Sequence, residues 1–175
     1  GTGNGEMKTR VIRATLQVLL AVSVLGMSLS LQADEAADDL QAGIDAFNRG
    51  DLPGAMTLYE KAAEAGSAEA QVRLAYLLDY AQDNERAVHW YRAAADQGSP
   101  DGIAGLASMY VKGEGVEEDY TRARELYEKA ADAGHEKSIR LLIGAYENGE
   151  LDVEKDATRA AYWRDRQASL RGSGN

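Results

Sequence analysis

The sequence predicts an all-α fold, an α–α superhelix (solenoid) of about four helix–turn–helix repeats. Only two prolines and one phenylalanine occur among 175 residues, and alanine, glycine, glutamate and arginine are abundant. That composition favours helices with small residues at close contacts over strands, which are rich in β-branched and aromatic residues. In addition, nearly identical segments recur along the chain at spacings of 32 and 36 residues. Self-similarity at such a period is typical of stacked helical repeats.

The segment that recurs most clearly ends in a glycine. Tyr59–Ser67 reads Tyr-Glu-Lys-Ala-Ala-Glu-Ala-Gly-Ser, and it matches Tyr91–Ser99 and Tyr127–His135. The glycines fit the position after a helix that needs a left-handed backbone. The serines that follow two of them, Ser67 and Ser99, can cap the next helix. Each of these segments is therefore expected to end one helix and begin another.

A second shared element precedes each of these helices. It begins with an aspartate that can cap the helix, followed four residues later by alanine. The four aspartates are Asp51, Asp83, Asp119 and Asp156. A third element, of the form Leu-Ala-x-x-Leu, Leu-Ala-x-x-Tyr or Leu-Ile-x-x-Tyr, lies upstream of the last three aspartates. Each unit is therefore predicted as helix A, a turn, helix B and a glycine corner, and the units cover residues 36–66, 67–98, 99–134 and 135–170 of a domain that spans 34–175.

The third unit carries a more specific pattern. A Tyr-x-x-Gly-x-Gly-Val loop at 110–116 leads to Asp-x-x-Arg-Ala at 119–123 and then to Ala-Ala-x-x-Gly at 130–134. This pattern resembles the Sel-one-like repeat, a relative of the tetratricopeptide repeat. The first two units are closer to the tetratricopeptide pattern, because the second lacks the glycine loop. The resemblance implies an adaptor that gathers or restrains other proteins. Cysteine-rich relatives bind or hydrolyse β-lactams, but this chain has no cysteine.

The N-terminal region has the layout of an export signal. Residues 1–6 are interpreted as a tag remnant or an upstream extension. From Met7, three basic residues precede a mostly apolar run at 14–29, and small residues precede Asp34. We expect a signal peptide over 7–33 with cleavage after Ala33. The apolar run is short for a bilayer, which takes about 20 residues. The alternatives are an uncleaved N-terminal anchor and a buried core helix. A periplasmic or secreted location is expected, or anchoring by the uncleaved helix.

Composition and missing motifs argue against several functions. The net charge of −10 repels nucleic-acid phosphates and anionic lipids, so neither nucleic acid nor membrane insertion after signal cleavage is expected. Gly113-Glu-Gly115 lacks the rest of a nucleotide-binding fingerprint. His89 and His135 lack partners at ligand spacing, so no metal or other cofactor is expected. No serine or zinc hydrolase motif occurs, and no catalytic residue is assigned. The alternative is a cell-envelope enzyme or accessory that acts on peptidoglycan or β-lactams.

The partner-binding surface is predicted from the resemblance, which implies that the A helices line a concave face. Helix-A residues outside the core-facing stripe would point into that groove, and tyrosine and arginine are enriched at binding hot spots. We therefore predict that the chain is an exported adaptor or regulator that binds a protein or peptide there. A plain solvated face is the alternative, and the sequence leaves the oligomeric state and the partner open. The predicted partner-binding residues are Tyr76, Asp79, Tyr80, Ser108, Lys112, Arg140 and Glu147.

The predicted export signal can be tested by the mass of the exported chain. Expressed with its leader in a bacterium that has a periplasm, the protein should be recovered from the periplasm with Asp34 as its first residue. Intact-mass spectrometry of the periplasmic and membrane fractions is the measurement. Recovery of the uncut chain in the membrane fraction would favour the anchor instead.

Overall fold

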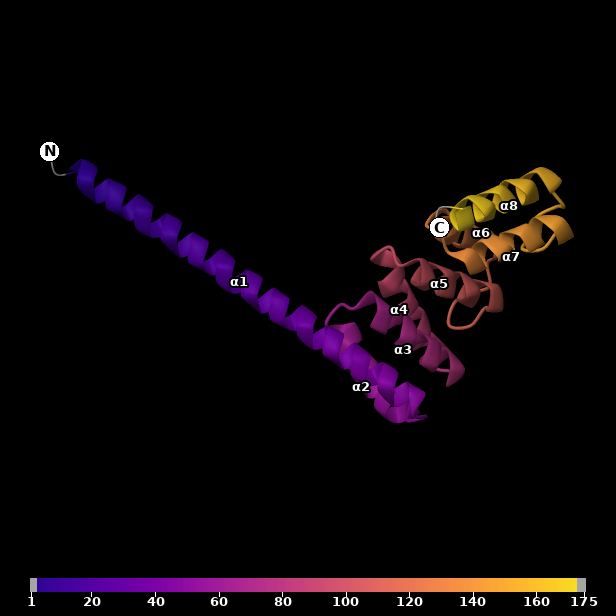
Figure 1. Ribbon diagram of the computed structural model, residues 1–175, viewed down its shortest axis with the longest axis horizontal. Coiled ribbons are helices and arrows are strands. Elements are labelled where there is room, and N and C mark those ends of the chain that lie inside the picture. The colour runs from indigo at the N-terminus through magenta and orange to yellow at the C-terminus, as the bar shows by residue number, and fades with distance from the viewer. Residues whose placement is uncertain (1–2, 173–175) are drawn as a thin grey trace.

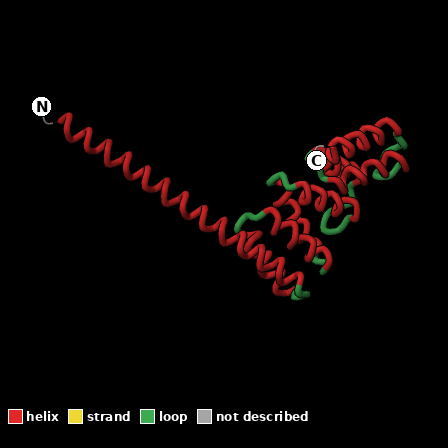
Figure 2. The backbone as a smooth tube through the Cα atoms, viewed as in Figure 1, coloured by secondary structure: helices red, strands yellow, loops and turns green. Residues whose placement is uncertain are grey.

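The computed structural model describes residues 3–172; residues 1–2 and 173–175, and most side chains before residue 30, lie outside the described part. Between residues 3 and 172 the chain forms eight α-helices and no strand, which confirms the predicted all-α class. Figure 2 shows the helices joined by short loops. The helices are α1 Gly3–Asn48, α2 Leu52–Glu64, α3 Ala68–Tyr80, α4 Asn84–Asp96, α5 Pro100–Lys112, α6 Tyr120–Asp132, α7 Glu136–Asn148 and α8 Ala157–Gly172.

The helices form four stacked pairs, with α1, α3, α5 and α7 as the A helices and α2, α4, α6 and α8 as the B helices. Each helix packs mainly on the helices before and after it in the chain (Figure 1). The predicted glycine corners are confirmed, because Gly66, Gly98 and Gly134 have φ angles of +94°, +82° and +89°. Residues with a Cβ rarely adopt this region, so glycine permits the sharp reversal between one pair and the next.

Polar side chains begin most of the helices as predicted. Asp51, Ser67, Ser99 and Asp119 each accept a hydrogen bond from the backbone N–H three residues further on. Asp83 is the exception, since its side chain makes no capping hydrogen bond at the start of α4. The prediction for Asp83 was wrong because its carboxylate turns to the guanidinium of Arg86, 3.3 Å away.

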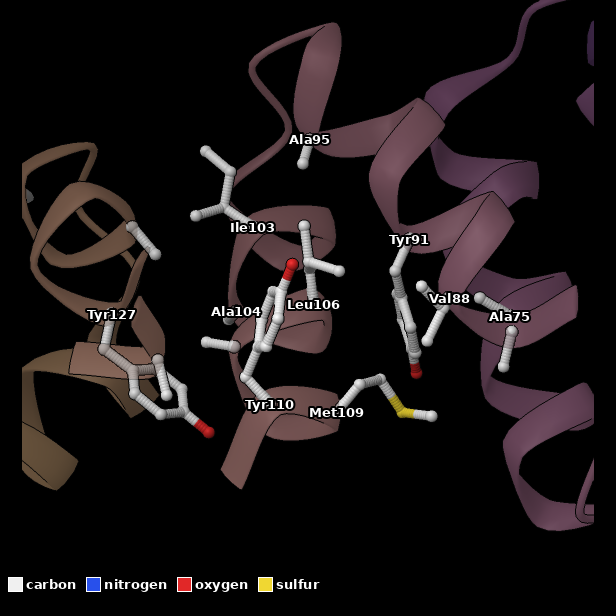
Figure 3. Close-up of a cluster of buried hydrophobic side chains, with 14 of the residues drawn as sticks. Ala75, Val88, Tyr91, Ala95, Ile103, Ala104, Leu106, Met109, Tyr110 and Tyr127 are labelled. Carbon is white, nitrogen blue, oxygen red and sulfur yellow. The ribbon is translucent and has the colours of Figure 1, made fainter. Parts of the chain in front are cut away.

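The core follows the repeat. The alanine four residues after each aspartate is at most 1% exposed, so neighbouring helices approach closely. Tyr59, Tyr91 and Tyr127 are buried beside these alanines. Figure 3 shows Tyr91 and Met109 lying between adjacent helices. Of the two tryptophans, Trp163 is buried, but Trp90 is only half-buried at the edge of the core.

Glycine makes one of these contacts possible. A Cβ placed on Gly105 in α5 would lie 2.3 Å from the ring of Tyr91 in α4. That distance is well inside van der Waals contact, so the ring would have to move out of a packed interior. Gly144 in α7 is different, because nothing lies within 4 Å of a Cβ built there.

The recurring Arg-Ala and Tyr positions of the last two units have a shared physical role. The guanidinium of Arg122 lies 5.1 Å from the ring centre of Tyr110, and that of Arg159 lies 5.3 Å from the ring centre of Tyr146. Such cation–π contacts join the end of helix A to the start of helix B. The second unit has leucine at the tyrosine position, and there Arg86 instead reaches Glu60 of the preceding unit at 2.6 Å.

The first helix is continuous through the predicted cleavage site. Figure 1 shows α1 extending far beyond α2 and away from the other repeats. The buried residues described in α1 begin at Ala36, which follows the predicted cleavage site. Most side chains of the predicted signal peptide lie outside the described residues, and its cleavage stays a prediction. Among the described residues, no helix combines the length and apolarity that crossing a membrane requires.

The close contact at Gly105 predicts opposite effects for two glycine-to-alanine substitutions. Gly105→Ala should lower the free energy of unfolding by about 1–3 kcal/mol, because the added methyl overpacks the tyrosine. Gly144→Ala should raise it by roughly 0.5–1 kcal/mol, because alanine favours the helix and has room. Urea denaturation followed by circular dichroism measures both. Equal effects of the two substitutions would contradict the packing argument.

Candidate interaction surface

A hollow in the described part of the chain crosses all four repeats. We call it the central groove, and its volume is about 820 Å³. Most of its lining comes from the A helices α3, α5 and α7, which agrees with the expected position of a binding face. Its lining residues are Phe47, Tyr59, Glu69, Val72, Arg73, Tyr76, Leu77, Tyr91, Ser99, Asp101, Ala104, Gly105, Tyr127, His135, Lys137, Ser138 and Leu141.

Three repeat-equivalent tyrosines from the B helices reach the central groove. Tyr59, Tyr91 and Tyr127 are each at most 7% exposed, so only a small part of each ring borders the open space. Burial raises the pKa of Tyr91 well above its usual value, and the negative charge of Asp79 adds to the effect. The pKa of Tyr127 is also raised by burial, although a hydrogen bond with Ser108 acts the other way. The phenols of Tyr91 and Tyr127 therefore stay neutral at physiological pH, and the three buried rings form a rigid floor.

The rim of the central groove is more polar, and most of its charges are paired. Arg73 lies 2.8 Å from Glu69 on the same helix. The apolar and aromatic rim residues include Phe47 and Tyr76, which are 38% and 57% exposed. A groove with an aromatic floor, exposed aromatic rings and little unpaired charge suits an amphipathic protein segment better than a small ion.

His135 has a structural role that the sequence analysis missed. Its Nδ1 accepts a hydrogen bond from the backbone N–H of Ser138 and so caps α7, while its Nε2 lies 3.2 Å from Asp101. The side chain is only 14% exposed, so it lies largely inside the protein. The signal was present in the sequence, because His135 follows Gly134 as Ser67 follows Gly66.

A second, smaller hollow lies where α3 ends. We call it the end pocket; its volume is about 260 Å³. The ammonium of Lys112 lies between two carboxylates there, 2.9 Å from Asp79 and 3.1 Å from Glu114. Partial burial lowers the pKa of Lys112, but its hydrogen bonds to Asp79 and Glu114 outweigh this and raise it overall. The lining residues are Tyr76, Asp79, Tyr80, Gln82, Asn84, Lys112 and Glu114.

The structure brings together four of the seven predicted partner-binding residues. Tyr76, Asp79, Tyr80 and Lys112 all line the end pocket, and Tyr76 also lines the central groove. Tyr76 and Tyr80 are 57% and 77% exposed, as their place outside the core-facing stripe predicted. Lys112 is held by two carboxylates in the end pocket, so its positive charge is already paired there.

The other three predicted residues line neither hollow. Ser108 is half-buried and interacts with Tyr127. Arg140 is exposed and lies 3.4 Å from Glu136 on its own helix. Glu147 forms an ion pair with Arg164 of α8. Their assignment to a partner site stays a prediction.

Within the described residues, no group of three or more histidine, aspartate or glutamate side chains is placed to hold a metal ion. Most charged side chains of the two hollows instead pair with one another. The surface can therefore bind through shape, aromatic contact and charge.

The family model for the Sel1 repeat matches the chain at residues 43–67, 68–99, 100–135 and 142–163. The chain belongs to the Sel1 repeat family. The four matches correspond to the four helix pairs and confirm the resemblance drawn from the third unit. Sel1 repeats are generally modules for protein–protein interaction and are typically non-catalytic scaffolds.

Similar proteins include a Sel1-repeat-containing protein, YjcO, of Escherichia coli K12. It is 41% identical over 120 residues, which cover 57% of this chain and 52% of the relative. Another is HRD3A of Arabidopsis thaliana, named as a component of an ERAD-associated E3 ubiquitin-protein ligase. It is 29% identical over 124 residues, which cover 61% of this chain and 18% of HRD3A. The chain thus spans about half of the first relative and a smaller part of the second.

Two solved structures share the fold. A Sel1 repeat protein from Oxalobacter formigenes superposes with a TM-score of 0.69 at 25% identity, covering 79% of this chain and 58% of that one. The protein c5321, described as a protective antigen of uropathogenic Escherichia coli strains, gives 0.68 at 32% identity, covering 77% of this chain and 30% of that one. Both confirm the solenoid.

The raised pKa of Tyr91 predicts a loss of stability at alkaline pH. An unfolded tyrosine ionises near pH 10, whereas the folded Tyr91 resists ionisation. The contribution of neutral Tyr91 to the free energy of unfolding is complete below pH 10. It is lost as pH rises from there toward the folded pKa, by roughly 1 kcal/mol per pH unit. The free energy of unfolding, measured with urea, should fall less between pH 8 and pH 11 for Tyr91→Phe than for the wild type. The exposed Tyr162→Phe should behave as wild type; if it matched Tyr91→Phe, burial would not be the cause.

Proposed function

We propose that the chain is an exported adaptor or regulator of the cell envelope that holds a segment of a partner protein in the central groove. The observation that carries this proposal is the groove itself, which takes its lining from all four repeats. A surface shared by every repeat exists only when the whole solenoid is assembled. Extended concave surfaces of this kind are what repeat proteins use to bind partners.

The composition of the groove supports a protein partner. Tyrosines offer large, rigid contact area at a small cost in conformational entropy, and they are enriched among hot-spot residues. The floor is preorganised, because Tyr59, Tyr91 and Tyr127 are fixed in the core. Binding would therefore order few groove side chains beyond the exposed rim residues such as Tyr76, which limits the entropic cost.

The relatives support the same kind of role. HRD3A is named as a component of a ubiquitin-ligase assembly, and this chain resembles part of it. Export is supported by the basic and apolar pattern over residues 7–33, followed by small residues before Asp34. The alternative of an enzyme acting on peptidoglycan or β-lactams stays a hypothesis, for which turnover by the purified protein would be the test.

A photo-cross-linking experiment tests the groove. The full chain is made with benzoylphenylalanine in place of Tyr76, which is 57% exposed and lines the groove. The matched control carries the same group in place of Tyr162, which is 53% exposed on α8 and lines neither hollow. After irradiation in cell-envelope extract, mass spectrometry identifies the adducts.

We expect a discrete adduct from position 76 that position 162 does not give, and excess unlabelled protein should compete it away. The same partner should be lost by Tyr76→Ala but kept by Tyr162→Ala, with helix content unchanged by circular dichroism. Identical adducts from both positions, or none from position 76, would overturn the assignment of the groove.

A further inference from the structure

In the end pocket, the ammonium of Lys112 is the cation that pairs with the carboxylates. Both carboxylate oxygens of Asp79 accept from the ammonium of Lys112, at 2.9 and 3.1 Å, although the two residues belong to different repeats. Glu114 also contacts this ammonium. Two carboxylates thus face one cation, and that cation is carried by a flexible side chain that is 40% exposed.

Exposed aromatic rings border this ion pair. Tyr76 and Tyr80 are four residues apart on α3, so they lie on the same face of the helix, with Asp79 beside them. Tyr80, at 77%, is the most exposed large apolar side chain described in the chain. A carboxylate beside two open tyrosine faces offers a cation a charge partner and a π surface at once.

The turn after α3 contains a non-glycine residue in the left-handed backbone conformation. Gln82 has a φ angle of +62°, and Gly50 occupies the equivalent place in the first unit with a φ angle of +81°. The two turns make the same pattern of backbone hydrogen bonds. Glycine adopts this conformation freely, whereas a residue with a Cβ is strained in it. The second unit thus has a strained glutamine where glycine would fit, and the glutamine side chain lines the end pocket.

The pocket also contains an unused acceptor. The side-chain oxygen of Asn84, which lines the pocket, is buried and has no hydrogen-bond partner. A buried polar atom without a partner is costly and calls for an explanation. Together with the amide of Gln82, it gives the pocket acceptor groups besides its carboxylates.

We infer that the end pocket binds an arginine side chain of the partner, and that Lys112 occupies its place in the free chain. The incoming guanidinium donates two parallel hydrogen bonds to Asp79 and stacks on Tyr76 or Tyr80, while Lys112 remains with Glu114. The identity of the partner rests on the proposed function, but the chemistry of the pocket does not.

Arginine fits this site better than other cations. A planar guanidinium matches a carboxylate with two hydrogen bonds and stacks on aromatic rings, whereas an ammonium is a strongly hydrated point charge. With arginine on Asp79 and Lys112 retained by Glu114, each of the two carboxylates has a cation of its own. The net charge of −10 on the whole chain also favours the approach of a basic segment. Because Tyr76 borders both hollows, a segment lying in the central groove can place this arginine in the end pocket.

Binding of a small probe to the purified full chain tests the inference without any partner. N-acetyl-arginine methylamide is titrated into isotope-labelled protein and followed by NMR. The citrulline analogue, which is neutral and nearly the same shape, is the matched ligand control. We expect shifts confined to the residues around Asp79, Tyr80 and Gln82, with the citrulline probe binding about tenfold more weakly.

Variants give effects of opposite sign. Asp79→Asn and Tyr80→Ala should each weaken binding of the arginine probe about fivefold or more. Lys112→Gln should strengthen it severalfold, because the internal competitor is removed. A pocket without selectivity for arginine would not bind the probe more weakly in the first two variants and more tightly in Lys112→Gln. Tyr162→Ala is the matched aromatic control and should leave binding unchanged.

The inference is overturned if arginine and citrulline probes bind alike, or if Lys112→Gln weakens binding. Its failure is distinguishable from failure of the proposed function. A photo-adduct from position 76 with no arginine selectivity would keep the adaptor and remove the arginine site. Arginine selectivity without any adduct would keep the site and remove the adaptor.

Discussion

The close approach of neighbouring helices is the constraint on which the rest of the structure depends. Alanine at the repeated positions of the B helices, and glycine at places such as Gly105, bring backbones near enough that one aromatic ring fills each remaining gap. Tightly packed interiors leave little room for a different arrangement. The tyrosines of the first three units are therefore fixed in the core, and the stacked units leave a hollow lined mainly by the A helices.

The binding surface is a consequence of this packing. Buried tyrosines that serve the core also form the floor of the central groove, so the groove is rigid where it is deepest. The exposed side chains lie at the rim and in the end pocket, among them Tyr76 and Tyr80. An arrangement of this kind has a preformed shape with a few adjustable contacts, which is the usual design of a site that recognises protein segments.

Charge is organised differently in the two hollows. In the central groove, acids and bases mostly pair within the rim, and this leaves aromatic and apolar contacts to decide affinity. In the end pocket, Asp79 and Glu114 outnumber Lys112, and tyrosines and uncharged amides complete the lining. Exposed ion pairs are weak, so a lysine held in one can be exchanged for a cation that binds with better geometry.

The sequence by itself determined the all-α class, the four repeats, the glycine corners and most of the caps, because each depends on residues close together in the chain. It also predicted that Tyr76 and Tyr80 are exposed, since helical periodicity alone separates them from the core stripe. Only the tertiary structure decided which side chains meet. Asp79 and Lys112 are 33 residues apart and come together through the stacking of two repeats, whereas Arg140 pairs within its own helix. Contacts between repeats depend on the offset of the stack, which no local pattern specifies.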